Sequence, residues 1–245
     1  MAKEISFIQS ENFSDRTSGA VIDTIIIHHT EVDNLKRCLE LLTKKEHMVS
    51  SHYLVDYDGS IYQLVDLEKK AWHAGLSCWR GRENINDYSV GIEIINNGLT
   101  PFKAEQIESV IYLCSLIKEH YPIDQLNIIG HSDVAPDRKD DPSKFFHWQE
   151  LAKNNLGIYS YKTLSNEENL VLYKICNSSP EINALKLKLA KFGYQLETTG
   201  NTYDQELNQV INAFKRHHSP ETLGNYGWDK LCDLKLDDLL VSYYE

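Results

Sequence analysis

Apolar runs alternate with amphipathic stretches along the first two thirds of the chain. The runs in "DTIIIHH", over Thr24–His29, and in "YSVGIEII" are apolar almost throughout and predict strands buried on both faces. "SHYLVDYDGSIYQLV" alternates on either side of Asp58 and Gly59, a dipeptide suited to a tight turn, and predicts a hairpin. "LNIIGH" predicts a further short strand that ends at His131.

Two amphipathic segments between these strands predict helices. "NLKRCLELLTKKE" places apolar residues at helical spacing from Leu35 to Leu42, with Asn34 able to cap the first turn. A second helix is predicted to begin at Thr100 and Pro101, which occur in the order of a cap and a first-turn proline. Strands that alternate with helices, together with one hairpin, indicate a mixed sheet covered by helices.

The pattern changes after residue 157. Residues 157–169 are polar and without a period, which predicts a linker. Apolar positions then recur at helical spacing in 181–192 and 204–217, and a weaker helix is predicted at Leu170–Cys176. The predicted fold is therefore α/β, with a mixed central β-sheet flanked by helices over residues 1–160. A small all-α three-helix domain follows over residues 161–245.

Composition narrows the class of protein. The 245 residues carry a formal net charge of −11, so the phosphate backbone of a nucleic acid would be repelled and is not an expected partner. No apolar run of about 18 residues is present to form a transmembrane segment, and the start of the chain lacks a secretory pattern. The five cysteines are an odd number and form no Cys-x-x-Cys pair, which favours free thiols. These features predict a cytoplasmic protein.

A cluster of charge in "GHSDVAPDRKDDP" follows the last predicted strand. His28 and His29 end one strand, His131 ends another, and the loop with Pro136 could return Asp141 to the same place. Two histidines and one carboxylate leave an open coordination position, as a hydrolytic zinc site requires, although the same set also fits non-haem iron. Spacing does not choose between His28 and His29, and either could instead pack in the core.

Two further charged residues suggest hydrolysis. Glu93 lies in a predicted buried strand, where a carboxylate is costly unless it is paired or has a chemical task such as general base. The alternative is a salt bridge to Arg80 or Arg82. Lys139 is a candidate for stabilising an oxyanion, and its alternative is a solvated surface lysine.

The sequence indicates the roles of three other histidines less specifically. His73 in "AWHAG" is a candidate for lining a site. His217 and His218, near a predicted helix end, are expected to be exposed.

Five segments of the chain, taken in their order along the sequence, resemble one known family. Over about Asp23 to Leu151 the chain is similar to the zinc-dependent N-acetylmuramoyl-L-alanine amidases of type 2, a group that includes the peptidoglycan recognition proteins. The matching segments are "IIIHHT", "VSSHYLVDYDGSIYQLV", "AWHAG", "WRGRENINDYSVGIEI" and "GHSDVAPDRKDDP". The resemblance implies a mixed sheet flanked by helices and cleavage of the amide between N-acetylmuramic acid and L-alanine.

The resemblance also implies roles for particular residues. The family's zinc ligands fall on His28, His131 and Asp141, with one Zn²⁺ per chain, and leave the role of His29 open. Its glutamate and lysine fall on Glu93 and Lys139. By the resemblance, Trp72 and His73 are expected to line the substrate groove. Arg80 and Arg82 are candidates for holding a stem-peptide carboxylate, because the arginine guanidinium matches a carboxylate in a bidentate way.

The C-terminal segment resembles a second family. "LKLKLAKFGYQLETTGNTYDQELNQVINAFKRHHSP" is similar to three-helix peptidoglycan-binding domains, although Lys215 stands where that family commonly has glutamine. The expected partner is therefore peptidoglycan or a muropeptide, and nothing in the sequence indicates an oligomeric state. A binding domain for polymer makes the cell envelope, reached by atypical export, the alternative to the predicted cytoplasmic location. The alternative function is a non-catalytic peptidoglycan sensor, which a complete ligand set disfavours.

Overall fold

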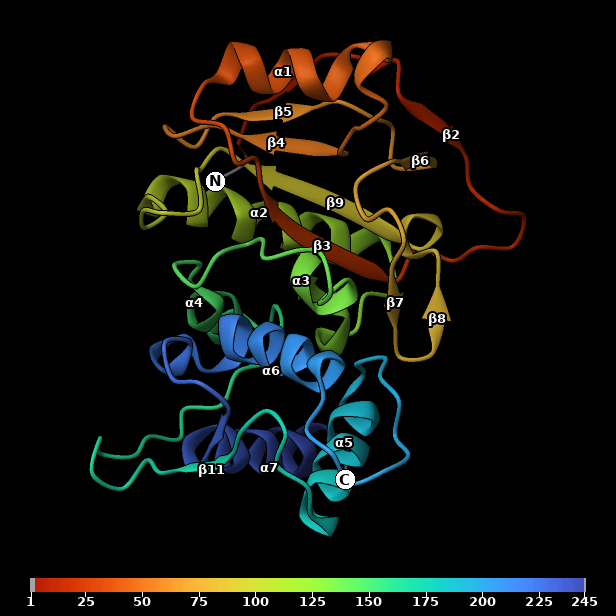
Figure 1. Ribbon diagram of the computed structural model, residues 1–245. Coiled ribbons are helices and arrows are strands. Elements are labelled where there is room, and N and C mark those ends of the chain that lie inside the picture. The colour runs from red at the N-terminus through yellow and green to blue at the C-terminus, as the bar shows by residue number, and fades with distance from the viewer. Residues whose placement is uncertain (1–2, 245) are drawn as a thin grey trace.

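The computed structural model describes residues 3–244, which are built around one six-stranded mixed sheet (Figure 1). Its strand order is β1-β5-β4-β9-β3-β10. The strands are β1 Ile5–Phe7, β3 Thr24–His29, β4 Tyr53–Val55, β5 Ile61–Gln63, β9 Ser89–Ile94 and β10 Ile128–Gly130. β3 runs parallel to both β9 and β10, whereas β4 and β5 form the predicted antiparallel hairpin. The mixed sheet and its principal strands are confirmed.

Three two-stranded pairs lie outside this sheet. They are β2 Phe13–Asp15 with β6 Lys69–Ala71, β7 Cys78–Trp79 with β8 Arg82–Glu83, and β11 Val171–Tyr173 with β12 Trp228–Asp229. The α-helices are α1 Leu35–Thr43, α2 Ala104–His120, α3 His131–Val134, α4 Trp148–Lys153, α5 Pro180–Phe192, α6 Gln205–His218 and α7 Lys230–Tyr244. Short 3₁₀ turns are η1 Lys45–His47, η2 Ile85–Asp87, η3 Gln125–Asn127 and η4 Pro220–Thr222.

Alternation along β3 decides which face of the sheet each side chain occupies. Ile25 and Ile27 join a cluster that includes the apolar side of α2, whereas Ile26 joins a cluster with α5, α6 and α7. Because side chains alternate along a strand, His28 lies on the same face as Ile26. Leu54 of β4 pairs in register with Glu93 and packs against α1 on this face. The face that carries His28 is therefore covered by α1 and by the C-terminal helices.

The C-terminal helices α5, α6 and α7, called here the helical unit, share a core with the sheet. One cluster of buried residues joins Ile26, Ile129 and Val134 to Leu189 and Phe214 of the helical unit. In Figure 1 these helices lie below the sheet, next to α3 and α4. Residues 157–169 contain no helix or strand, as predicted, but Ile158 within them is buried in the same cluster. The boundary between residues 160 and 161 stays a prediction.

Two predicted helix positions are wrong. The second helix begins at Ala104 rather than at Thr100, because the side chain of Gln106 accepts a hydrogen bond from the Lys103 N–H and makes Lys103 the cap. The segment Leu170–Cys176 contains strand β11, since a short apolar run does not distinguish a strand from a helix. The third helix of the unit is α7, whose buried leucines do recur at helical spacing.

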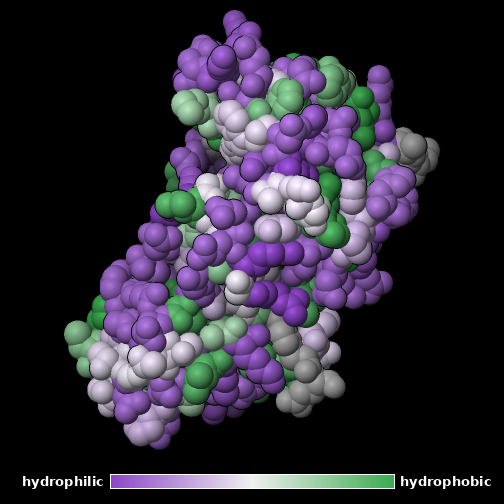
Figure 2. All heavy atoms as spheres, turned by 90° about the vertical axis from the view of Figure 1, so that its right-hand side faces the viewer, coloured by the Kyte–Doolittle hydropathy of each residue, from purple (hydrophilic) through white to green (hydrophobic). Residues whose placement is uncertain are grey.

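Hydrophilic side chains cover most of the face seen in Figure 2, and apolar side chains are scattered among them. Among the described residues, no helix has both the length and the apolar character needed to cross a bilayer.

Candidate metal centre and active site

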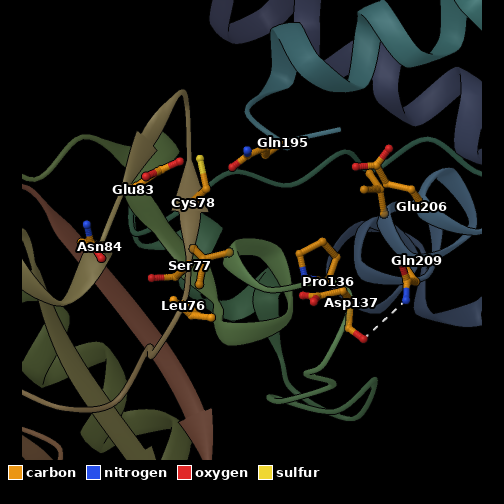
Figure 3. Close-up of a pocket in the computed structure, with 12 residues that line it drawn as sticks. Leu76, Ser77, Cys78, Glu83, Asn84, Pro136, Asp137, Gln195, Glu206 and Gln209 are labelled. Carbon is orange, nitrogen blue, oxygen red and sulfur yellow. Dashed lines mark hydrogen bonds between the residues drawn. The ribbon is translucent and has the colours of Figure 1, made fainter. Parts of the chain in front are cut away.

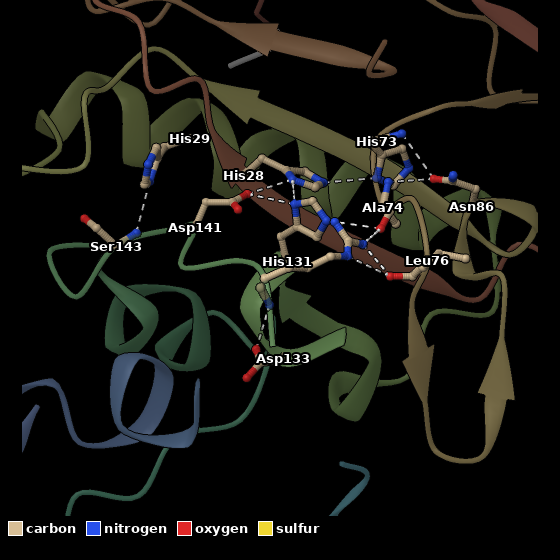
Figure 4. A network of polar contacts seen from close by, with 12 residues as sticks. His28, His29, His73, Ala74, Leu76, Asn86, His131, Asp133, Asp141 and Ser143 are labelled. Atoms are coloured by element: carbon tan, nitrogen blue, oxygen red, sulfur yellow. Dashed lines mark hydrogen bonds and ion pairs between the residues drawn. The ribbon is translucent and has the colours of Figure 1, made fainter. Parts of the chain in front are cut away.

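Three predicted ligands meet at the carboxyl ends of β3 and β10 (Figure 4). His28 is the second-to-last residue of strand β3, His131 directly follows β10, and Asp141 lies on the loop after α3. Asp141 Oδ2 lies 2.9 Å from His28 Nδ1 and 3.2 Å from His131 Nδ1, and the two ring nitrogens are 3.1 Å apart. All three side chains are buried. Adjacent parallel strands therefore bring together residues that are far apart in the sequence.

The donor atoms of this cluster fit a divalent metal such as zinc. His131 Nε2 donates to the carbonyl of Ala74 at 3.2 Å, which leaves the lone pair of Nδ1 facing the cluster. Asp141 Oδ1 is buried without a hydrogen-bond partner. Two imidazole nitrogens and one carboxylate that converge in a buried site form a ligand set that zinc prefers.

Electrostatics keep His28 and Asp141 in the forms that bind metal. Burial, reinforced by the neighbouring His131, lowers the pKa of His28 to about 4, so its ring is neutral at pH 7. Burial opposes ionisation of Asp141, but the adjacent imidazoles of His131 and His28 outweigh it and hold the pKa of Asp141 well below its usual value. A metal binds neutral histidine and ionised carboxylate, and His28 and Asp141 are in these forms at neutral pH.

A cavity of about 210 Å³ opens beside the cluster. It is lined by His28, His29, Thr30, Glu31, Cys38, Leu41, Leu42, Val49, His73, Glu93, His131, Lys139 and Asp141. The three candidate ligands, the candidate base and the candidate oxyanion partner thus face one space, between α1 and the loop that follows α3.

Glu93 is placed as a general base would be. It pairs in register with His28 in the parallel β9–β3 ladder, so both side chains leave the sheet on the same face. Glu93 Oε2 is buried without a hydrogen-bond partner. Burial, together with the negative charge of Asp141, raises the pKa of Glu93 well above its usual value, and Lys139 opposes that rise.

The alternative salt bridge from Glu93 to Arg82 is wrong. The Arg82 guanidinium instead makes two hydrogen bonds to Asp23, at 2.8 and 2.5 Å, and lies 4.1 Å from the centre of the Tyr88 ring. Arg80 and Arg82 both line a separate cavity that contains none of the candidate ligands. Their predicted contact with a stem-peptide carboxylate stays a prediction.

His73 lies directly against the candidate metal cluster. Its Nδ1 is 3.0 Å from His28 Nε2, and burial, with the nearby His28, lowers its pKa well below the usual value. A Cβ on Gly91 would lie 2.6 Å from the His73 ring, so glycine at that position makes room for it. Trp72 points elsewhere, with its indole N–H donating to Ser14 Oγ at 3.2 Å. The structure thus brings His73, but not Trp72, to the cluster.

His29 has a structural task at the cavity. Its Nδ1 accepts a hydrogen bond from the backbone N–H of Ser143 at 3.2 Å, which puts the proton of the neutral ring on Nε2. His29, Glu31 and Asp140 offer ligand atoms within 4.8 Å of one another, but a protonated Nε2 has no lone pair for a metal. His29 therefore fastens the backbone just after Asp141.

A larger cavity, of about 470 Å³, lies elsewhere between the sheet domain and the helical unit (Figure 3). Its walls carry Glu83, Asp137 and Glu206 but no histidine, and Gln209 Nε2 donates to the Asp137 carbonyl at 3.4 Å. Without a convergent ligand set or an unpartnered buried base, it lacks the chemistry of the smaller cavity.

The expectation that His217 and His218 are exposed is wrong. Both side chains are buried, at 3% and 1% exposure, on the face of α6 that packs inward. The signal was present, because these positions follow Phe214 by three and four residues and extend its apolar stripe. His217 Nδ1 donates to Asp133 Oδ2 at 2.7 Å, a long-range contact that the sequence did not indicate.

A mixed sheet that carries a buried two-histidine, one-carboxylate cluster beside a glutamate with a buried oxygen is an arrangement suited to hydrolysis at a bound metal. The family model described as N-acetylmuramoyl-L-alanine amidase matches residues 18–144. The chain therefore belongs to the N-acetylmuramoyl-L-alanine amidase family, and it is an amidase, as the resemblance implied.

Individual relatives support this family assignment. The N-acetylmuramoyl-L-alanine amidase AmiD of Escherichia coli K12 is 36% identical over 239 residues, covering 91% of this chain and 83% of the relative. The 1,6-anhydro-N-acetylmuramyl-L-alanine amidase AmpD of Enterobacter cloacae is 42% identical but covers 42% of this chain and 55% of the relative. A solved complex of E. coli AmiD with anhydro-N-acetylmuramic acid-L-Ala-D-γ-Glu-L-Lys superposes with a TM-score of 0.75. It is 29% identical and covers 96% of this chain and 99% of that one.

Proposed function

We propose that His28, His131 and Asp141 hold one zinc ion per chain and that Glu93 is the general base of amide hydrolysis. The observation that carries the proposal is the convergence of the three buried ligand atoms, within 4.8 Å of one another, at a cavity that Glu93 and Lys139 also line. When bound, zinc supplies Lewis acidity for the scissile carbonyl and for the attacking water.

Glu93 moves the proton in this reaction. Its carboxylate takes a proton from the water that attacks the lactyl carbonyl of N-acetylmuramic acid, and it later gives that proton to the departing amine of L-alanine. A carboxyl group with a raised pKa suits both steps, because it is a better base than an exposed glutamate and holds the proton until the amine leaves.

Lys139 is proposed to stabilise the oxygen on which negative charge develops. The loop after α3 places it on the wall of the same cavity, and its positive charge already acts on Glu93. A fixed cation in a partly buried site acts more strongly than one in water, since the surroundings screen it less.

The substrate proposed is a small 1,6-anhydro-muropeptide. The support is that the AmiD relative was solved with an anhydro-N-acetylmuramic acid peptide and that the AmpD relative is named for the anhydro sugar. The helical unit is proposed to contact peptidoglycan as well, as its resemblance to peptidoglycan-binding domains implies. A cytoplasmic location suits the small fragment, and an envelope location suits the polymer.

The central test is removal and return of the metal. Protein stripped with a chelator is expected to lose release of the stem peptide from an anhydro-muropeptide, and one equivalent of Zn²⁺ per chain should restore it. Chromatography of the released peptide measures the rate, and elemental analysis measures the metal. Full activity in metal-free protein would contradict the zinc site.

The second arm compares turnover of the anhydro-muropeptide with that of intact sacculi. Cleavage of the fragment with no release from sacculi is the expected result. Preferential release from sacculi would contradict the proposed substrate but not the metal site.

A further inference from the structure

The helical unit reaches the segment that carries two of the proposed zinc ligands. Helix α6 packs along α3 and the loop that leads to Asp141, and Val210 of α6 shares a buried cluster with Val134 of α3. Farther along, Gln209 donates to the Asp137 carbonyl, as Figure 3 shows. The segment between the two ligands therefore lies against helices that belong to the other half of the chain.

One buried carboxylate links the two halves at the metal site. Asp133 Oδ2 accepts hydrogen bonds from the backbone N–H of Gly130 at 2.8 Å and from His217 Nδ1 at 2.7 Å. Asp133 Oδ1 accepts a hydrogen bond from the Tyr194 hydroxyl at 2.6 Å. One of these donors, His217, is on α6 and another, Tyr194, lies between α5 and α6, and Asp133 itself is 1% exposed. A buried carboxylate needs such donors, because water cannot replace them.

His217 is held in a fixed orientation for this contact. Its ring stacks on Trp148, with centroids 3.7 Å apart and planes at 21°, and on His218, with centroids 3.8 Å apart and planes at 10°. A ring packed on both faces cannot turn away from Asp133 without opening the core. Trp148 in turn lies against Gly130, since a Cβ on Gly130 would be 3.3 Å from its ring.

Asp133 and His131 share one short turn. Helix α3 runs only from His131 to Val134, so no longer helix fixes the direction in which the His131 ring leaves the backbone. The hydrogen bond from the Gly130 N–H to Asp133 closes this turn where it leaves β10. The hydrogen bonds from Tyr194 and His217 to Asp133 therefore fix the turn that presents His131 to the cluster.

We propose that Tyr194 and His217 are positioning residues of the metal site, acting through Asp133 to hold the turn that presents His131. The inference rests on the proposed function, because it takes His131 as a zinc ligand. The helical unit then completes the metal site of the sheet domain, beyond any contact that it makes with peptidoglycan. Groups that orient ligands from outside the coordination sphere commonly change metal affinity or activity by about 10- to 100-fold.

The experiment uses full-length Tyr194→Phe and His217→Gln. Competition with a chelator of known affinity measures zinc binding, and kcat and KM are measured at saturating zinc on an anhydro-muropeptide. Each variant is expected to bind zinc about tenfold more weakly or worse. KM should change little, because neither residue lines the cavity, whereas kcat should fall. In metal-free Tyr194→Phe, the Gly130 amide should also exchange its hydrogen faster.

Tyr203→Phe is the matched control. Tyr203 is a buried tyrosine of the same half of the chain, but its hydroxyl donates to Asn208 at 3.2 Å and not to Asp133. The Tyr203→Phe variant should keep wild-type zinc affinity. Unchanged zinc affinity in both test variants, or an equal loss in Tyr203→Phe, would refute the positioning role. Failure of the wild type to bind zinc would instead refute the proposed metal site.

Discussion

At the residue scale, the chemistry depends on one carboxylate that has no hydrogen-bond partner at its buried oxygen. Glu93 lies in an apolar strand, and its buried Oε2 has no hydrogen-bond partner among the described residues. Such a position costs folding free energy, since a buried polar group without a partner is destabilising. The cavity beside it explains why the cost is tolerated, because an unengaged carboxylate is available to accept a proton from water.

The first prediction concerns this residue. Glu93→Gln should keep the shape of the side chain and bind zinc normally, but kcat should fall about 100-fold or more because the amide cannot take a proton. Glu105→Gln, an exposed change on α2, is the control and should leave kcat unchanged. A Glu93→Gln enzyme with full zinc content and near wild-type kcat would show that another group is the base.

The sequence predicted the cluster itself but not the residues that support it. His28, His131 and Asp141 could be anticipated because the strand pattern, the loop and the family motifs all point to the same edge of the sheet. Asp133 was indistinguishable from the other charged residues of its loop, because its partners Tyr194 and His217 lie more than sixty residues away in sequence. A contact across that separation leaves no periodic signal.

At the element scale, the structure explains the lysine at position 215, where peptidoglycan-binding domains commonly have glutamine. Its ammonium group is fully buried 3.0 Å from Asp229 Oδ2 and donates to the carbonyls of Asn225 and Gly227 at 2.9 and 2.6 Å. Helix α6 is thereby tied to the segment between η4 and β12. Here the lysine is balanced by a buried aspartate, which a glutamine would not neutralise.

The second prediction follows from this pair. Lys215→Met should lower the free energy of unfolding by about 3–5 kcal/mol, because it leaves Asp229 as an uncompensated buried charge. Lys188→Met is the matched control, since Lys188 pairs with Asp237 at 2.7 Å on the surface, where about 0–1 kcal/mol is expected. Urea unfolding followed by circular dichroism measures both. Equal losses in the two variants would contradict the assigned importance of the buried pair.

Element boundaries were least predictable where a segment is short. The runs at β3 and β9 were long and apolar enough to be read correctly, whereas the three residues of β11 pair with β12 from a distant part of the chain. Only that pairing selects strand over helix for β11. The hairpin was read correctly because its turn residues lie between its strands.

At the scale of the whole molecule, the two predicted domains share one interior. The chain pattern indicated a sheet domain followed by separate helices, but Ile26 of the central strand packs in the same cluster as Leu189 and Phe214. An apolar strand residue gives no information about which element covers it, so this shared core was not predictable. As a consequence, the helical unit lies against the sheet face that bears the candidate metal ligands.

The last prediction concerns how acid destabilises this packed interior. His52 is fully buried, with Nδ1 accepting from the Gly91 N–H and Nε2 next to the Lys69 carbonyl. Burial, with the nearby Arg16 charge, lowers its pKa to about 3, against 6.5 in the unfolded chain. The folded state therefore binds fewer protons between these values, so stability is full above about pH 6.5 and falls as the pH drops towards 3.

The expected size is about 1.4 kcal/mol of unfolding free energy per pH unit within that window for His52 alone. Urea unfolding at a series of pH values between 7 and 5 measures the slope. His52→Gln should reduce this slope by the contribution of one proton, about 1.4 kcal/mol per pH unit. His120→Gln, an exposed change at the end of α2, should leave the slope unchanged. The imidazole of His52 should also show no titration by NMR down to pH 5. A His52 signal that titrates near pH 6.5 would contradict the prediction, because the folded and unfolded states would then bind this proton equally.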